Sequence, residues 1–183
     1  GITYTRWGRT KCPGRNTQLV YSGYVGGSSH KHKGGAVDYL CMPYNPDWNY
    51  KYTNGTSGYK GYVFGAEYET TFNHIGIGKS HLNHDVPCAV CRTVGSTSVL
   101  IVPGKTKCEK SWTKQYSGYL MSGYYGHEAA SQYICVDKDA EAIPDSSANK
   151  NGKLLFPVEA RCGSLKCPPY YEGRELACVV CTK

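Results

Sequence analysis

Ten cysteines are the residues of this chain whose chemistry most needs an explanation. Four of them form two CxxC pairs, "PCAVC" at residues 87–91 and "ACVVC" at residues 177–181. Such pairs bind zinc, exchange electrons with a partner thiol, or form structural disulfides. The choice among these three chemistries decides which class of protein the sequence encodes.

Structural disulfides fit the spacing best. The two pairs of a zinc ribbon lie about 15 to 20 residues apart, whereas here they lie in different halves of the chain. A thioredoxin-like pair opens a helix in a βαβ unit, and no such unit surrounds either pair. A structural disulfide would stabilise a loop-rich segment by about 2 to 4 kcal/mol through restriction of the unfolded chain. Because alternate residues of a strand point to opposite faces, the cysteines of each CxxC should pair elsewhere.

The composition indicates a secreted protein. The chain has 183 residues, 40% of them hydrophobic, which suits one domain or two small ones. The high, even cysteine count indicates an oxidising compartment. The chain begins at Gly1, as after removal of a signal peptide, and no apolar run approaches the roughly 18 residues that span a bilayer. We therefore expect an extracellular protein without a transmembrane segment.

The net charge of +7 comes from basic residues scattered singly along the chain. This pattern does not indicate nucleic-acid binding. It either favours acidic glycans and anionic cell surfaces or serves solubility alone.

The sequence repeats itself once. "GRTKC" at residues 8–12 recurs as "GKTKC" at residues 104–108, and "YSGY" occurs at residues 21–24 and 116–119. An aromatic-aliphatic-Cys triplet follows in each half, and each half ends with its CxxC. The order of these landmarks predicts two related domains, residues 1–94 and 95–183.

Local signals within each half are those of strands. "TQLVYSGYV", "STSVLIVPG" and "LLFPVEARC" are rich in β-branched, aromatic and apolar residues, and Gly, Pro, Asn and Asp separate them. Helical periodicity is confined to a weak candidate around "HEAASQYICV". We predict an all-β fold of two tandem pseudo-symmetric, disulfide-bonded, β-rich subdomains. Residues 43–61 should form an exposed loop with "NG" at its tip.

Several motifs together resemble a known family. "YTRWGRTKCP" followed by "LVYSGY", and "PCAVC" followed by "VLIVPGKTKC", are similar to the duplicated C-terminal non-collagenous domain of type IV collagen. They look closer still to the C-terminal domain of spongin-like short-chain collagens of invertebrates. The resemblance covers essentially the whole chain and implies two like β-rich subdomains, with trimers formed by exchange of hairpins. No Gly-x-y triplets precede the domain, so we expect either a removed collagenous stem or a free-standing version.

The resemblance also implies a disulfide pattern. In the second half it includes a small-loop pair that the first half lacks. The implied pairs are Cys12–Cys91, Cys41–Cys88, Cys108–Cys181, Cys135–Cys178 and Cys162–Cys167.

A recognition function follows from the same resemblance, since some related stand-alone domains from marine invertebrates are galactose-type lectins. Tyrosine rings stack on the apolar face of a hexose, and Asn, Asp, His and Glu side chains orient its hydroxyls. The seventeen tyrosines equally suit strand surfaces and the core.

The loops that follow the two "YSGY" copies are the best candidates for ligand binding, because duplicated loops should present similar clefts. The alternative is that they are mobile connections. "GAEYE" at residues 65–69 adds weaker candidates, of which Glu69 is one. The predicted ligand-binding residues are His30, His32, Asp38, Glu67, Tyr68, Tyr124, Tyr125, His127 and Glu128.

Metal binding and catalysis are the less favoured alternatives. His30 and His32 would face the same side of a strand, and His81, His84 and Asp85 would gather on a turn, but neither set completes a recognised site. No GxSxG, HExxH or phosphate-binding loop occurs, and the even cysteine count leaves no free thiol as a nucleophile. A pair of converging carboxylates, as in glycosidases, stays open at this point. We predict a protein that is not an enzyme and needs no metal or cofactor.

Two functions therefore compete. The favoured one is a secreted, multivalent lectin that binds galactose-type glycans or glycoproteins and forms a homo-oligomer. The alternative is an extracellular-matrix assembly domain, whose contacts would be sheet edges and exchanged hairpins.

Overall fold

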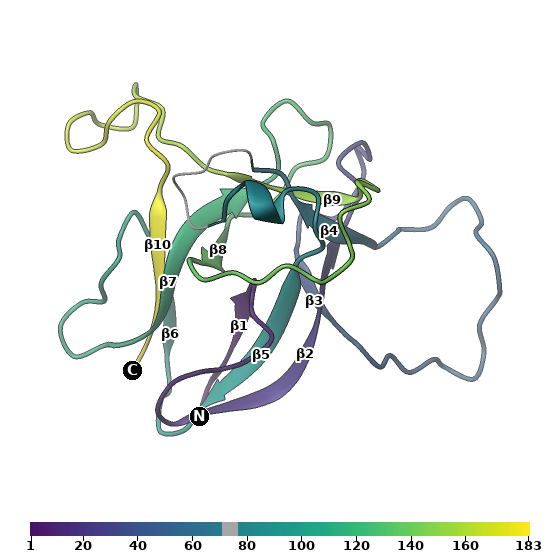
Figure 1. Cartoon of the computed structure of the whole chain (residues 1–183), viewed down its shortest axis with the longest axis horizontal. Coiled ribbons are helices and arrows are strands. Elements are labelled where there is room, and N and C mark those ends of the chain that lie inside the picture. Colours follow the sequence, from purple (N-terminus) through teal and green to yellow (C-terminus); the bar gives the residue numbers. More distant parts are fainter. Residues whose placement is uncertain (71–76) are drawn as a thin grey trace.

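The computed structural model describes residues 1–70 and 77–183, which form an all-β fold with one short 3-10 helix at Lys79–His81 (Figure 1). The predicted all-β class is confirmed, and a strand lies in each of the three predicted segments, although the strand in "LLFPVEARC" ends at Pro157. The weak helix candidate is wrong, because residues 124–133 form turns and loop before a strand begins at Ile134. The ten strands are β1 (Thr3–Trp7), β2 (Thr17–Gly27), β3 (Leu40–Pro43), β4 (Phe64–Tyr68), β5 (Pro87–Thr93), β6 (Val99–Pro103), β7 (Thr113–Ser122), β8 (Ile134–Asp137), β9 (Lys153–Pro157) and β10 (Ala177–Thr182).

All ten strands belong to one mixed sheet, in the order β6-β10-β7-β8-β1-β5-β2-β4-β9, with β3 also paired to β2. A further pairing joins β9 to β7, so the path from β7 through β8, β1, β5, β2, β4 and β9 returns to its start. Most neighbours are antiparallel, and the two pairings that join the halves of the chain, β1–β8 and β4–β9, are parallel. Since the sheet runs across residue 94, the two-domain boundary stays a prediction.

The halves of the chain use the same set of strand pairings. In the first half β5 pairs with β1 and β2, and β2 pairs with β3 and β4. In the second half β10 pairs with β6 and β7, and β7 pairs with β8 and β9. The segments written twice in the sequence therefore occupy corresponding places in the sheet.

Five disulfides join all ten cysteines, in the pairs that the family resemblance implies: Cys12–Cys91, Cys41–Cys88, Cys108–Cys181, Cys135–Cys178 and Cys162–Cys167. Cys88 packs in a buried cluster with Trp7 and Tyr39, whereas Cys91 packs in another with Tyr4. The two cysteines of this CxxC thus point to opposite faces of β5, as strand alternation requires. Five disulfides indicate that the protein folds in an oxidising environment.

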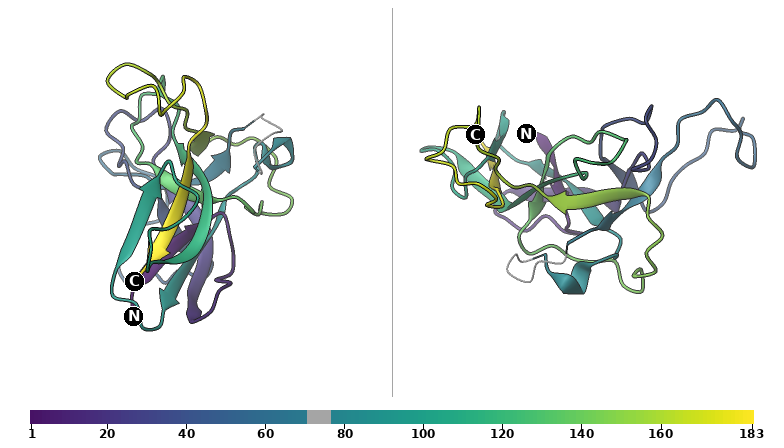
Figure 2. Two further views of the ribbon diagram at one scale, coloured as in Figure 1. Left: turned by 90° about the vertical axis from the view of Figure 1, so that its left-hand side faces the viewer. Right: turned by 90° about the horizontal axis from the view of Figure 1, so that it is seen from above.

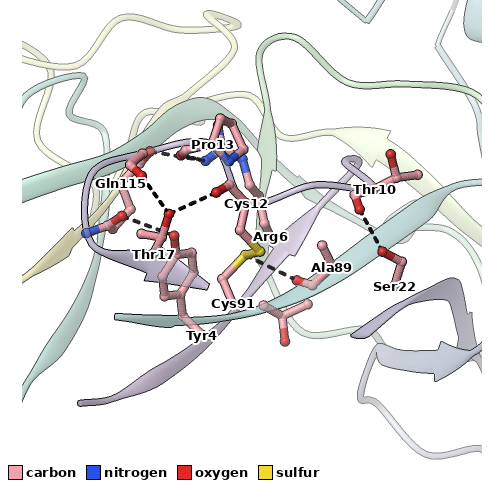
Figure 3. Close-up of a disulfide and its surroundings, with 12 residues drawn as sticks. Tyr4, Arg6, Thr10, Cys12, Pro13, Thr17, Ser22, Ala89, Cys91 and Gln115 are labelled. Carbon is pink, nitrogen blue, oxygen red and sulfur yellow. Dashed lines mark hydrogen bonds between the residues drawn. A yellow bond between two sulfur atoms is a disulfide. The ribbon is translucent and has the colours of Figure 1, made fainter. Parts of the chain in front are cut away.

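A buried ion pair fixes the seam between the halves. Nε of Arg6 on β1 donates to Oδ2 of Asp137 on β8 at 2.7 Å, and both side chains are buried. The Arg6 guanidinium also lies over the Tyr116 ring, 4.9 Å from the ring centroid, and this aromatic contact stabilises its charge. Figure 3 shows Arg6 beside the Cys12–Cys91 disulfide, whose loop is held by a hydrogen bond of 2.8 Å from Thr17 Oγ1 to the Cys12 carbonyl.

Residues 44–63 connect β3 to β4 as a long, exposed loop that extends away from the sheet (Figure 1), as predicted. Trp48 and Tyr50 are exposed in it, and Gly55 of the "NG" pair has a positive φ of 79°. The described part of the chain contains no helix of the length and apolar character that spans a membrane. The views at right angles in Figure 2 place the two termini near each other.

Candidate functional site

The two loops that follow the "YSGY" copies contact each other. The amide of Ala129 donates to the carbonyl of His30 at 3.1 Å, and the amide of Gln132 donates to the carbonyl of Val37 at 3.0 Å. The rings of His30 and His127 lie 4.6 Å apart between their centroids. Residues predicted to line two separate clefts are therefore partly brought together.

The prediction that His30 and His32 share one side of a strand is wrong. Two successive turns, closed by His32 N–Ser29 O and Gly35 N–His32 O hydrogen bonds, end the strand before His30. His30 instead faces His127, and the His32 ring packs against Phe64, with a centroid distance of 5.6 Å.

A cleft of about 860 Å³ opens beside the second of these loops. The end of β7, the end of β9, the segment after β4 and the segment before β10 contribute to its wall. Its lining is rich in aromatic rings and carboxylates: Glu69, Leu82, Ser122, Gly123, Tyr124, Tyr125, Tyr133, Phe156, Pro157, Val158, Glu159, Arg161 and Glu175. This combination suits a small polar ligand that has an apolar face.

Tyr124 is the centre of the aromatic part of the cleft. Its ring centroid lies 4.5 Å from that of Tyr125, 5.7 Å from that of Phe156 and 5.0 Å from that of His127. A hydrogen bond with Tyr125 raises the pKa of Tyr124. The Tyr125 side chain is 93% exposed, so a face of its ring is open to a ligand.

His127 packs against the rings of Tyr124 and Phe156. Its Nδ1 is buried without a hydrogen-bond partner, and burial, followed by the nearby His30, lowers its pKa. A neutral His127 is therefore favoured, and its ring packs against Phe156 as an aromatic group.

The carboxylates of the cleft differ in their surroundings. Burial and the neighbouring Glu67 raise the pKa of Glu69, and its Oε1 is buried without a hydrogen-bond partner. Arg161 is the one positively charged residue along the described lining, and two carboxylates already contact it. Its Nη1 lies 3.4 Å from Glu159 Oε1, and its Nε lies 2.6 Å from Glu172 Oε1.

Glu67 and Tyr68, two of the predicted ligand-binding residues, are buried and form hydrogen bonds within the protein instead. Glu67 is 3% exposed, and its Oε1 accepts hydrogen bonds from the amides of Lys150 and Asn151 at 2.8 and 3.0 Å. Tyr68 is fully buried and donates from its hydroxyl to the Glu141 carbonyl at 2.8 Å. Neither side chain is accessible to a ligand, so both assignments are corrected.

The remaining candidates are divided between the cleft and other surfaces. Tyr124 and Tyr125 line the cleft, whereas the exposed Asp38 and Glu128 are not among its lining residues. His32 lies at the corresponding place in the first half, since the His32–Phe64 contact (5.6 Å, 65° between ring planes) has a counterpart in His127–Phe156 (5.8 Å, 66°).

The second histidine group is held by backbone and side-chain contacts. His81 Nε2 lies 2.8 Å from the Ala140 carbonyl, and His84 Nδ1 lies 3.2 Å from the Leu82 carbonyl. Within residues 1–70 and 77–183, no group of three or more His, Cys, Asp or Glu side chains is arranged to hold a metal ion.

Sequence reasoning did not find Tyr133, Phe156, Glu159, Arg161 and Glu175 as cleft residues. Tyr133 belongs to a repeated landmark, and Phe156, Glu159 and Arg161 belong to the predicted strand segment "LLFPVEARC", but neither signal points to a cleft. Phe156, Glu159, Arg161 and Glu175 come together only through the β7–β9 pairing and the Glu159–Glu175 bridge. A scan of the sequence against models of known protein families finds no match.

Proposed function

We propose that this protein is an extracellular, non-catalytic lectin that binds glycans in the cleft beside Tyr124 and Tyr125. The observation that carries the proposal is the combination of an open tyrosine ring with carboxylates in one cleft. A hexose would place its apolar face on Tyr125, and its hydroxyls would donate to the glutamates. The family resemblance favours a galactose-type sugar, and the five disulfides support an extracellular site of action.

Two tandem subdomains, residues 1–94 and 95–183, form the second part of the proposal. The repeated strand pairings support a duplication of one unit. His32 and Phe64 in the first half correspond to His127 and Phe156 in the second, and each pair contacts a further ring, Tyr62 before β4 and Tyr124 after β7. Two weak sites on one chain would raise avidity by about 10² to 10⁴ on a surface that presents many sugars.

A specific observation favours the second candidate function, an assembly domain of the short-chain collagen type. Four of the five strands in each half pair in one order, β6-β10-β7-β8 and β1-β5-β2-β3, and β8 joins the two sets by pairing with β1. The equivalent of that pairing would join β3 to β6, each of which has one strand partner among the described residues. Val99, Leu100 and Ile101 are exposed along β6. A second copy that supplied β3 would cover this apolar edge.

One experiment separates the two functions. A glycan array is probed with the whole chain, with and without a chelator, and the same sample is analysed by size-exclusion chromatography with light scattering. Binding to galactose-terminated glycans, inhibited by free sugar, supports the lectin. Inertness on the array combined with a tight trimer would replace it with the assembly domain.

A further inference from the structure

The charge of the cleft is opposite to the charge of the whole chain. The protein has a net charge of +7, yet the cleft lining contains three glutamates, Glu69, Glu159 and Glu175, and a single arginine. Arg161 is already in contact with Glu159 and Glu172. The charges of Glu159 and Arg161 offset each other, and the lining as a whole still has three carboxylates against one guanidinium, so the cleft presents a negative field to a ligand.

A positive charge in the cleft would be favourable beside Glu69. Its neighbour Glu67 keeps its own carboxylate in place through the amides of Lys150 and Asn151. Glu69 Oε1 lacks a hydrogen-bond partner although the atom is buried. A positive charge in the cleft would act on Glu69 through space and offset the repulsion between the two carboxylates.

The aromatic wall favours the same kind of group. The faces of tyrosine and phenylalanine rings attract cations, and the lining includes Tyr124, Tyr125, Tyr133 and Phe156. A ligand that carries an ammonium on an apolar-faced ring meets both features at once. An anionic ligand would meet three carboxylates and an arginine that is already paired.

We propose that the cleft selects sugars that carry a free ammonium group, that is 2-amino-2-deoxyhexoses, over neutral and anionic sugars. The inference rests on the proposed lectin function and adds its ligand class. N-acetylation removes the positive charge and should abolish the preference, whereas a uronic acid should bind worst of all.

The test is isothermal titration calorimetry of the whole chain with galactosamine, galactose, N-acetylgalactosamine, galacturonic acid and choline. We expect galactosamine to bind about tenfold more tightly than galactose at low salt, and galacturonic acid to bind more weakly than galactose. In Glu69→Gln the ratio of the galactosamine and galactose affinities should fall toward one. Glu109→Gln, a matched change at an exposed glutamate outside the cleft lining, should leave both affinities as they are.

Each outcome separates the inference from the proposed function. Equal affinities for galactosamine and galactose in the unaltered chain would overturn the ammonium preference and leave the lectin intact. Binding of choline without any sugar would support recognition of an ammonium and overturn the lectin. Absence of binding to every ligand would overturn both. Because the ligand series uses the unaltered chain, a folding defect in Glu69→Gln cannot obscure the result.

Discussion

The contact between Arg6 and Asp137 is the best-defined polar interaction between the two halves. Removal of both charges from water is costly, and the pair is tolerated because Arg6 also donates to the Pro13 and Gln115 carbonyls and lies over Tyr116. Asp137 Oδ1 in turn accepts a hydrogen bond from the amide of Asp139. Loss of one partner would leave the other charged, buried and unpaired.

We predict that Asp137→Asn lowers the free energy of unfolding by about 3 to 5 kcal/mol, measured by urea denaturation. Asp139→Asn is the matched control, because Asp139 pairs with Lys138 on the surface and such exposed pairs add little to stability. Equal losses in the two variants would show that the buried pair does not hold the seam.

Lys153 is a buried cation with no hydrogen-bond partner on its Nζ. The amine lies 4.8 Å from the centroid of the Tyr39 ring, and burial, opposed in part by Asp38, lowers the pKa of Lys153. Between the lowered folded-state pKa and the unfolded value of about 10.4, the unfolded chain binds more protons than the folded one, so stability rises with pH in that window.

Lys153→Met should therefore stabilise the protein at pH 7, by about 1 kcal/mol or more. The advantage of the variant over the unaltered chain should shrink as pH approaches 10, because more of the lysine is then neutral already in the unfolded chain and folding buries less charge. Urea denaturation at pH 7 and pH 9.5 measures both effects. A variant that is less stable at pH 7 would show that the contact with Tyr39 outweighs the cost of burial.

The disulfides close loops of very different size. Cys41–Cys88 spans 47 residues of the chain, whereas Cys162–Cys167 spans 5. Loop-closure entropy predicts losses of about 4 kcal/mol for Cys41→Ala/Cys88→Ala and about 2 kcal/mol for Cys162→Ala/Cys167→Ala. Thermal melts under non-reducing conditions test which double variant loses more stability. A larger loss on removal of the Cys162–Cys167 disulfide would contradict the entropic account.

The loop after β7 presents Tyr125 as the most exposed ring of the cleft, so its removal should affect ligand binding more than folding. We predict that Tyr125→Ala weakens binding to galactose-terminated glycans about tenfold, the equivalent of one lost stacking contact of about 1.4 kcal/mol, with an unchanged melting temperature. Tyr50→Ala, at a ring 91% exposed on the 44–63 loop, is the matched control. Equal effects of the two changes on array binding would remove Tyr125 from the site.

Strands and cysteines were predictable because their signals are local or repeated. Period-two alternation on β5 separates Cys88 from Cys91, and the repeated landmarks give both halves the same order of strands. The cleft was not predictable to the same extent, since Phe156 and Glu175 reach it through pairings far apart in sequence. The prediction that Glu67 and Tyr68 bind a ligand was wrong for a related reason. Strand β4 lies between β2 and β9, and side chains on both of its faces are buried.

In the proposed assembly, the apolar strand β6 would decide whether copies associate through the sheet. If β3 of one copy pairs with β6 of another, Ile101→Lys should shift the chain toward the monomer, because a charge on an edge strand opposes pairing. Light scattering on the unaltered and altered chains measures the shift. Tyr59→Lys, on the exposed 44–63 loop, should leave the mass unchanged. An identical mass for all three chains would exclude β6 as the contact.

The disulfides Cys12–Cys91 and Cys108–Cys181, which enclose the two longest stretches of chain, have a mechanical consequence for a protein under tension. A pulling force is transmitted through each covalent bridge and bypasses the residues enclosed by it. Between Cys12 and Cys181, only the linker from Cys91 to Cys108 would lengthen, at about 3.3 to 3.6 Å per residue. Under tension the module would yield by a small, fixed extension and then behave as an almost inextensible link.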